Sequence, residues 1–94
     1  METPVQVKHE AEQSRFSLSV DDASGVLEYR RDGDLLSVLH TGVDPSLRGR
    51  GLAQLLTEAM LEFVRREGLA LQPVCSYTAA YLKRHPQADL KIVD

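Results

Sequence analysis

Apolar and polar residues alternate in the first part of the chain with the period of a β-strand. In the earliest such segment Phe16, Leu18 and Val20 are separated by serines, so one face is apolar. Two more apolar segments follow, and the Asp32-Gly33 pair between them favours a hairpin turn. The third segment is apolar on both faces, which is typical of an interior strand. The pattern predicts a meander of strands at 16–20, 26–30 and 35–43.

The pattern changes to the helical period after Pro45. Apolar side chains then recur at roughly 100° per residue, with charged side chains on the opposite side. Gly68 suits the C-terminal cap of such a helix. The apolar stripe expected to face the sheet consists of Leu52, Leu55, Leu56, Ala59 and Phe63.

The last third of the chain favours a fourth strand at 69–75, a second helix at 78–84 and a final strand at 90–93. Pro73 indicates that the fourth strand is an edge strand or contains a local break. The order of elements predicts an α/β (α+β) fold, in which an antiparallel meander precedes a β-α-β unit and a short C-terminal helix and strand.

The domain organisation follows from the same pattern. Residues 1–13 are mostly polar and are expected to form a flexible N-terminal segment. Residues 14–94 are expected to form a single domain, because no linker, repeat or low-complexity segment interrupts them.

Composition narrows the classes of function. The chain has 94 residues and a formal net charge of −3, which argues against a nucleic-acid-binding surface. No apolar stretch is long enough to span a membrane, and the polar start does not resemble a secretory signal. Cys75 is the single cysteine, and the three histidines are scattered without metal-ligand spacing. We expect a cytoplasmic protein with no bound metal, nucleic acid or membrane.

The segment Arg48-Gly49-Arg50-Gly51-Leu52-Ala53 lies directly before the predicted long helix. The start of a helix presents unpaired N–H groups and partial positive charge, which favour an anion. Glycines let a phosphate approach the backbone closely, and the two arginines add cationic donors. The segment therefore predicts a pyrophosphate site, with a merely solvated loop as the alternative.

The same segment resembles a family motif. Arg48-x-x-Gly51-x-Ala53 is similar to the R/Q-x-x-G-x-G/A motif with which GCN5-related N-acetyltransferases bind the pyrophosphate of acetyl-CoA. His40-Thr41 and the stretch PVCSYTAAYLKRHP, which starts at Pro73, extend the resemblance to a small subfamily of truncated, single-domain members. The resemblance covers residues 16–94 and implies an enzyme that moves an acetyl group from acetyl-CoA to an amine-bearing acceptor.

The resemblance also implies roles for individual residues. Residues 48–53 would hold the pyrophosphate, and Cys75 would lie where the acetyl group is bound. Tyr81 occupies a place similar to that of the tyrosine that often protonates the departing thiolate. Backbone groups at the end of the third strand would hold the pantetheine arm, at Thr41, Gly42 and Val43.

One departure from the subfamily concerns Gly42, because many members have an acidic residue there. The absence of that carboxylate puts its role as a general base in doubt. Truncated members also lack the N-terminal helices that shape the acceptor pocket of larger relatives. The resemblance therefore implies a large or flexible acceptor, or a site completed by a partner chain, as in a homodimer.

Three side chains are candidate catalytic residues, and each has a structural alternative. Cys75 could attack the thioester and become acetylated, or it could be a small core residue. The phenol of Tyr81 suits proton donation, or it could pack its helix against the sheet. His40 could assist Cys75 if the two strand ends converge, although a structural histidine is the commoner case.

Three functions remain open on the sequence alone. An N-acetyltransferase would let the amine attack acetyl-CoA directly, or would pass the acetyl group through Cys75. A non-enzymatic acetyl-CoA-binding or sensing module would need the same pyrophosphate seat without turnover. An interaction domain that has kept only the fold would need neither the glycines nor the arginines of residues 48–53.

Overall fold

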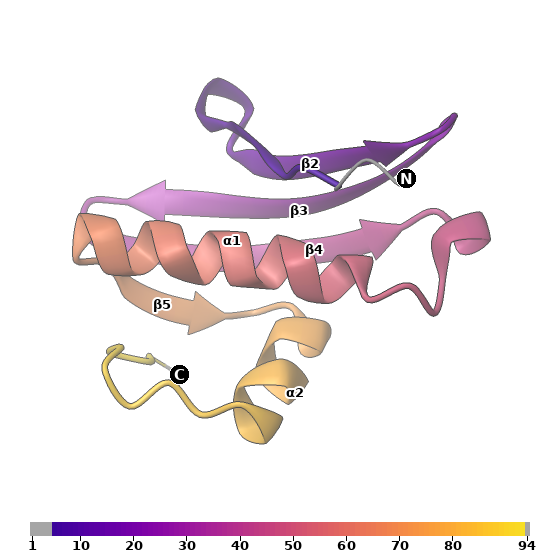
Figure 1. The fold of residues 1–94 in the computed structure, drawn as a ribbon. Coiled ribbons are helices and arrows are strands. Elements are labelled where there is room, and N and C mark those ends of the chain that lie inside the picture. The colour runs from indigo at the N-terminus through magenta and orange to yellow at the C-terminus, as the bar shows by residue number, and fades with distance from the viewer. Residues whose placement is uncertain (1–4, 94) are drawn as a thin grey trace.

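A mixed five-stranded sheet and two helices form the computed structural model, which describes residues 5–93 (Figure 1). Predictions for residues 1–4 and for Asp94 therefore lie outside the described residues. The sheet order is β1-β2-β3-β4-β5, antiparallel except for the parallel β4–β5 pair. The predicted α+β fold class is confirmed. The strands and helices are β1 (Lys8–Glu10), β2 (Arg15–Val20), β3 (Ala23–Asp32), β4 (Leu35–Val43), α1 (Leu52–Glu67), β5 (Ala70–Pro73) and α2 (Ser76–Arg84), with 3-10 helices η1 (Ala11–Gln13) and η2 (Pro45–Leu47).

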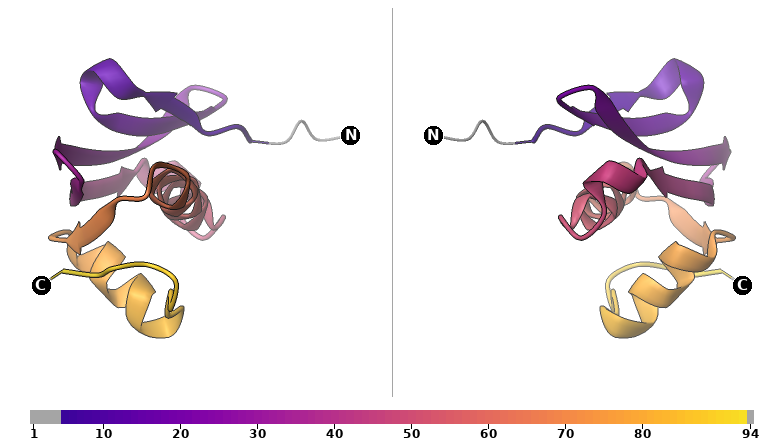
Figure 2. Two further views of the ribbon diagram at one scale, coloured as in Figure 1. Left: turned by 90° about the vertical axis from the view of Figure 1, so that its left-hand side faces the viewer. Right: turned by 90° about the vertical axis from the view of Figure 1, so that its right-hand side faces the viewer.

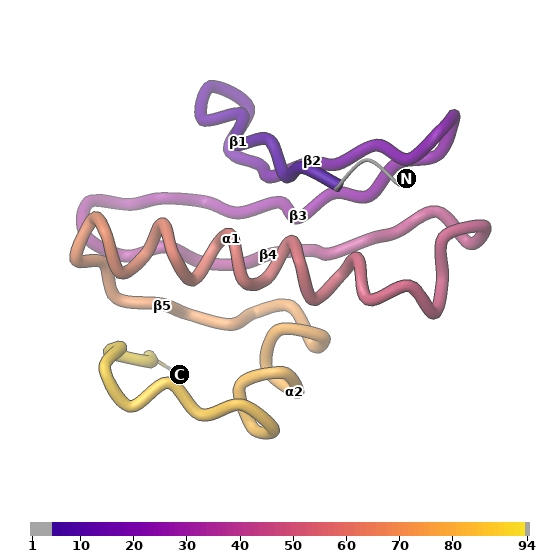
Figure 3. The backbone as a smooth tube through the Cα atoms, in the orientation of Figure 1, coloured from indigo at the N-terminus to yellow at the C-terminus, as the bar shows by residue number. Residues whose placement is uncertain are grey.

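The sheet begins earlier in the chain than the sequence predicted. Residues 8–10, assigned above to a flexible segment, form the edge strand β1 and pair antiparallel with β2 (Figure 3). A three-residue strand is too short to show the alternation on which sequence analysis depends. Contacts with β2 and β3 hold it instead. His9 stacks on Phe16 with ring centroids 4.2 Å apart, and its Nε2 is hydrogen-bonded to the Tyr29 hydroxyl at 2.6 Å.

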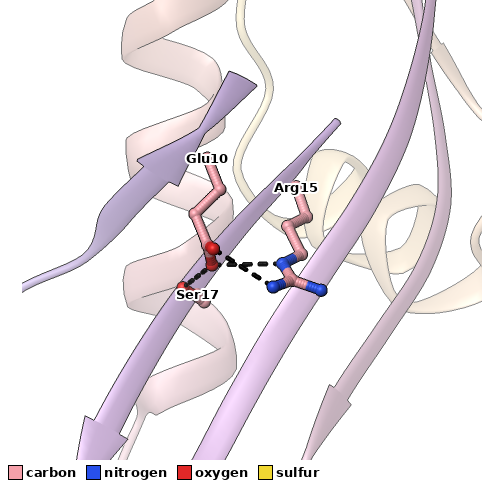
Figure 4. Close-up of polar contacts among 3 residues, drawn as sticks. All are labelled: Glu10, Arg15 and Ser17. Atoms are coloured by element: carbon pink, nitrogen blue, oxygen red, sulfur yellow. Dashed lines mark hydrogen bonds and ion pairs between the residues drawn. The ribbon is translucent and has the colours of Figure 1, made fainter. Parts of the chain in front are cut away.

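The opposite face of β1 carries a polar cluster of Glu10, Arg15 and Ser17 (Figure 4). Arg15 donates from Nε and Nη2 to the two carboxylate oxygens of Glu10, at 3.1 Å each. The Ser17 hydroxyl donates to Oε1 of the same carboxylate at 2.5 Å. These hydrogen bonds from Arg15 and Ser17 lower the pKa of Glu10 to about 2. The cluster therefore ties β1 to β2 through an ionised carboxylate.

Helix α1 covers one face of the sheet, as predicted, and α2 lies beyond the β5 edge (Figure 2). The predicted stripe is right for Leu52 and Leu56 but wrong for Leu55, which is 36% exposed. The buried row is set by side chains three and four residues apart, which lie on one face of a helix. Its members are Leu52, Leu56, Thr57, Met60, Leu61 and Val64. The helix ends at the predicted cap, Gly68, whose backbone is left-handed.

Strand β4 has the interior position that its apolar sequence predicted, between β3 and β5. Only one of its faces is covered by a helix of the described residues (Figure 2), and Leu39 is 47% exposed. The predicted final strand at 90–93 is reduced to a single parallel bridge between Leu71 and Ile92. No helix among residues 5–93 is both long and apolar enough to cross a bilayer.

The Glu10 cluster predicts how stability depends on acid. A carboxylate with a lowered folded-state pKa stabilises the protein fully above its ordinary pKa near 4.5, and this contribution is lost as the pH falls toward about 2. We therefore expect Glu10→Gln to lose stability at neutral pH and to weaken the pH dependence in that window. Urea unfolding at several pH values measures this.

The matched control is Glu12→Gln, since Glu12 lies in the adjacent η1 and takes no part in the Glu10 cluster. It should keep the wild-type acid profile. Identical profiles for the two variants and the wild type would contradict the role given to Glu10.

Candidate functional site

The middle of β4 contains one residue more than its partner strand. Tyr29 pairs with Val38, whereas the preceding residue, Glu28, pairs with His40. Leu39 between them has no partner, which makes it a β-bulge.

The bulge reverses the alternation of side chains in the second half of β4. Because one extra residue moves every later side chain to the other face, Thr41 rather than His40 continues the buried face of Val38. Thr41 accordingly pairs with the buried Leu27.

The parallel pairing of β4 with β5 stops at the same point. The last pair is Val38 with Pro73, after which the Val74 N–H donates to the Gln72 carbonyl at 3.1 Å instead of to β4. The Cys75 N–H still donates to the Val38 carbonyl at 2.8 Å, after which the chain turns into α2. From Leu39 onward β4 pairs only with β3. We call the opening so formed, residues 39–43 and 74–75, the fork.

Cys75 lies inside the fork, at the N-cap of α2 and 8% exposed. Its Sγ is 3.6 Å from Oγ1 of Thr41. Burial acts to raise the pKa of the thiol, but hydrogen bonds from the Thr78 N–H, the Thr41 hydroxyl and the Tyr77 N–H outweigh it, so the pKa is lowered. A helix N-terminus lowers the pKa of a cysteine in this way and increases its nucleophilic thiolate form.

Thr78 adds a hydroxyl to the same place. The residue is fully buried, and its Oγ1 makes no hydrogen bond of good geometry within residues 5–93. It nevertheless lies close enough to the Cys75 sulfur to contribute to lowering the thiol pKa. An unpaired buried hydroxyl is costly, and a polar group that enters the fork would satisfy it.

The structure brings Thr41, not His40, to Cys75. His40 is exposed on the other side of β4, where it pairs across the strands with the exposed Glu28. A Cβ at Gly42 would be 2.9 Å from Nε2 of His40, so the imidazole lies over the glycine. The glycine at the position where the subfamily often has an acid thus leaves room for this ring.

Two tyrosines lie one turn apart on α2, with ring centroids 6.4 Å apart. Tyr81, the predicted proton donor, is 5% exposed, and burial with the charge of Glu58 raises its pKa. Tyr77, which the sequence analysis did not select, lies nearer the helix start. Burial is the main cause that raises the pKa of Tyr77, and the charges of Glu58 and Cys75 raise it further. The charge of Arg84 acts in the opposite direction. The four-residue spacing of the tyrosines was the signal that they share one face.

The predicted pyrophosphate segment starts α1. Gly49 and Gly51 have φ of 81° and 72°, a left-handed backbone that favours glycine. Gly51 is the N-cap, no side chain caps the helix, and its first turn has no acidic residue. A Cβ added at either glycine would meet no atom within 4 Å, so the space beside this backbone is open. The N–H groups of the first helical turn have no acceptor within the helix, so they remain available to a ligand.

The charges around this helix start suit a diphosphate. Arg48 and Arg50 are exposed, and neither forms an ion pair with another residue of the range 5–93. Leu47 and Leu52 anchor the segment, since they are 4% and 5% exposed. Of the predicted ligands, Leu52 can therefore offer only its backbone. The preceding turn is fixed by Asp44, whose Oδ1 accepts hydrogen bonds from the Ser46 N–H at 3.0 Å and hydroxyl at 2.9 Å.

Two surface hollows adjoin Arg50, and neither includes the fork. The larger, of about 1110 Å³, runs along the segment 5–8 and β2. The smaller, of about 510 Å³, is lined by Asp21, Asp22 and Asp44, whose charges repel a phosphate. Within residues 5–93 no three His, Cys, Asp or Glu side chains gather as a metal site would require.

Comparison with protein families identifies the family of the chain. The family model described as GCN5-related N-acetyl-transferase matches residues 15–91. The chain belongs to this family. Acyl transfer is the general activity that family membership supports.

Individual relatives agree with the assignment. The chain is 34% identical over 86 residues to Protein NATD1 of Gallus gallus and of Mus musculus, a match that covers 88% of this chain and 78% of each relative. Protein NATD1 of Homo sapiens is 33% identical, with 88% and 76% covered.

Solved structures share the fold. A GCN5-like protein from Staphylococcus aureus, solved by NMR, superposes with a TM-score of 0.71 at 24% identity, covering 94% of this chain and 87% of that one. A Trypanosoma brucei acetyltransferase gives 0.54 at 18% identity, covering 89% and 70%.

The contacts of Cys75 predict the effect of one substitution. Thr41→Val removes a hydroxyl that stabilises the thiolate, so the pKa of Cys75 should rise and alkylation by iodoacetamide at neutral pH should slow. The rate of alkylation as a function of pH measures this.

Ser37→Ala is the matched control, because the Ser37 hydroxyl, also on β4, donates to Gln72 at 3.0 Å and not to Cys75. It should leave the alkylation profile unchanged. An unchanged profile in Thr41→Val would show that the Thr41 hydroxyl does not act on the thiol.

Proposed function

We propose that this protein is an N-acetyltransferase that takes the acetyl group of acetyl-CoA and transfers it to an amine. The observation that carries the proposal is that the C-terminal end of β4 connects two features, a reactive thiol and a helix start suited to an anion. The fork holds a nucleophilic thiol, and residues 48–53 form an open, cationic helix start. Family membership supports acyl transfer in general, and these two features support acetyl-CoA as the donor.

The proposed seat of the pyrophosphate is the start of α1. Its unpaired N–H groups, with Arg48 and Arg50, favour a group of two negative charges. The glycines leave the approach free of side-chain atoms. No nearby acidic side chain belongs to the first turn of the helix, so nothing in that turn opposes the anion.

The proposed place of the pantetheine arm is the free edge of β4. The departure of β5 leaves residues 39–43 without a partner on that side. Backbone groups of Thr41, Gly42 and Val43 can then bind the amides of the arm as a further strand would. In this arrangement the thioester would lie at the inner end of the fork, beside Cys75.

Two chemical routes fit such a placement. In the first, the amine attacks the thioester carbonyl directly, and a neighbouring acid protonates the departing thiolate. Tyr81 is the candidate by resemblance, and Tyr77 is a further candidate because it lies one helical turn nearer to Cys75 on α2. In the second, the Cys75 thiolate attacks first and carries the acetyl group as a thioester. Positioning of the reactants supplies much of the rate in either route.

The acceptor is proposed to reach the fork from the uncovered face of the sheet. No helix of the described residues lies there, and Leu39 and Val74 are 47% and 58% exposed near the opening. A large or flexible amine, or a second copy of the chain that completes the site, fits this open side. The cytoplasm is the proposed compartment, since a single reactive thiol suits a reducing environment.

A sensing module that binds acetyl-CoA without turnover is the second candidate. The observation that favours it is Gly42, where the chain lacks the acidic residue found in many subfamily members, with His40 lying over it. Release of the CoA thiol in the presence of amines separates the enzyme from the sensor.

The test is titration of acetyl-CoA into the wild type and into Gly51→Glu by isothermal calorimetry, with CoA release followed in the presence of a panel of amines. We expect micromolar binding by the wild type. Glu at position 51 combines a strained backbone, because φ is 72°, with a carboxylate against the phosphates. Affinity should fall about tenfold or more, equivalent to at least ~1.4 kcal/mol.

The matched control is Gly33→Glu. Gly33 also has a left-handed backbone, with φ of 61°, and open space around it, but it lies in the β3–β4 hairpin at the other end of the sheet. This variant should carry the same strain and bind acetyl-CoA as the wild type does. No binding by the wild type, or equal losses in both variants, would contradict the proposed seat.

A further inference from the structure

The environment of Cys75 suits a disulfide as well as a thioester. Its sulfur accepts hydrogen bonds from the N–H groups of Tyr77 and Thr78. The thiol donates to Oγ1 of Thr41 at 3.6 Å, and the Thr41 hydroxyl can donate to the sulfur once it is a thiolate. The buried Thr78 hydroxyl beside it lacks a partner of good geometry in the described part of the chain. This group of donors stabilises a thiolate, which is the form that attacks disulfides.

The free edge of β4 connects the region of the α1 start with this thiol. Along that edge, the four steps from Leu39 to Val43 rise about 13 Å. A CoA molecule whose pyrophosphate binds at residues 48–53 could extend its pantetheine arm along this edge, which is free of β5. Its terminal sulfur would then lie at the fork, on the side of Cys75.

We propose that Cys75 is a site of reversible thiol–disulfide exchange with coenzyme A disulfide, guided by the same seat that binds the CoA part of the acetyl donor. This inference rests on the proposed acetyl-CoA site, but not on turnover. The resulting mixed disulfide fills the fork and excludes acetyl-CoA until a reductant removes it.

The step is balanced without a further oxidant. The Cys75 thiolate attacks one sulfur of the CoA disulfide, and a new S–S bond forms between Sγ and that sulfur. The original S–S bond breaks, and its electron pair leaves with the second CoA as a thiolate, which takes a proton from water. Cys75 is oxidised, and one half of the CoA disulfide is reduced. Attack by a second thiol, such as dithiothreitol, reverses the reaction.

Mass spectrometry of the intact protein tests the proposal. The wild type is incubated with CoA disulfide and, separately, with glutathione disulfide, which lacks a diphosphate. Binding at the seat raises the effective concentration of the CoA sulfur at the fork. We expect the CoA adduct to form about tenfold faster or more than the glutathione adduct. Dithiothreitol should remove it, and Cys75→Ser should form no adduct.

Variants of the pyrophosphate seat, residues 48–53, distinguish exchange that depends on binding of CoA from the intrinsic reactivity of the Cys75 thiol. Gly51→Glu and the double variant Arg48→Gln/Arg50→Gln should lose the preference for CoA disulfide yet react with glutathione disulfide at the wild-type rate. Gly33→Glu should keep the preference. Because the glutathione rate reports on the thiol itself, a variant that misfolds is recognised by a change in that rate, and the second seat variant then decides.

Several results would overturn the inference. Equal rates for the two disulfides, a preference that survives in both seat variants, or no adduct at all would each do so. Calorimetric titration with acetyl-CoA distinguishes failure of the disulfide-exchange inference from failure of the proposed function. Binding without disulfide preference leaves the proposed donor site standing and removes only the exchange, whereas loss of both removes the site.

Discussion

The end of the β4–β5 ladder is the constraint on which the rest of the site depends. The chain turns away from β4 at Val74, whose N–H donates to the Gln72 carbonyl at 3.1 Å, and the bulge at Leu39 lies at the same level of β4. Had the ladder continued, β5 would occupy the strand edge that the pantetheine arm is proposed to use. The fork therefore arises from one turn at the end of β5 and one extra residue in β4.

The N-termini of α1 and α2 both belong to the proposed acetyl-CoA site, and they have complementary chemistry. Neither α1 nor α2 has a side-chain capping hydrogen bond or an acidic residue in its first turn. At α1 the N-cap is a glycine with arginines beside it, which suits a diphosphate. At α2 the N-cap is Cys75, whose thiolate the helix stabilises. In the proposed site, one helix start would bind the anionic end of the donor and the other would lie at its reactive end.

Sequence periodicity was enough for the order of elements from β2 to α2, because long segments with a single buried face show their period clearly, but the final strand that it predicted at 90–93 is only a single bridge. It missed β1, which has three residues, and the exact buried row of α1, where Leu55 lies at the margin. Residues 48–53 were identified from local chemistry that needs no distant partner. Thr41 was not connected to Cys75, since an apolar run such as residues 35–43 conceals the bulge that sets its facing. Tyr77 and Thr78 were not connected to Cys75 because the second helix was predicted to begin at residue 78, whereas it begins at Ser76, directly after Cys75.

An amide NMR titration with acetyl-CoA tests most directly the claim that the seat and the fork form one site. The account predicts that amides of residues 48–53, 39–43 and 75–78 shift together and saturate at one ligand concentration. The hairpin around Gly33 should remain unchanged. Shifts confined to one of the two regions, two different saturation points, or strongest shifts along β1 and β2 would contradict it.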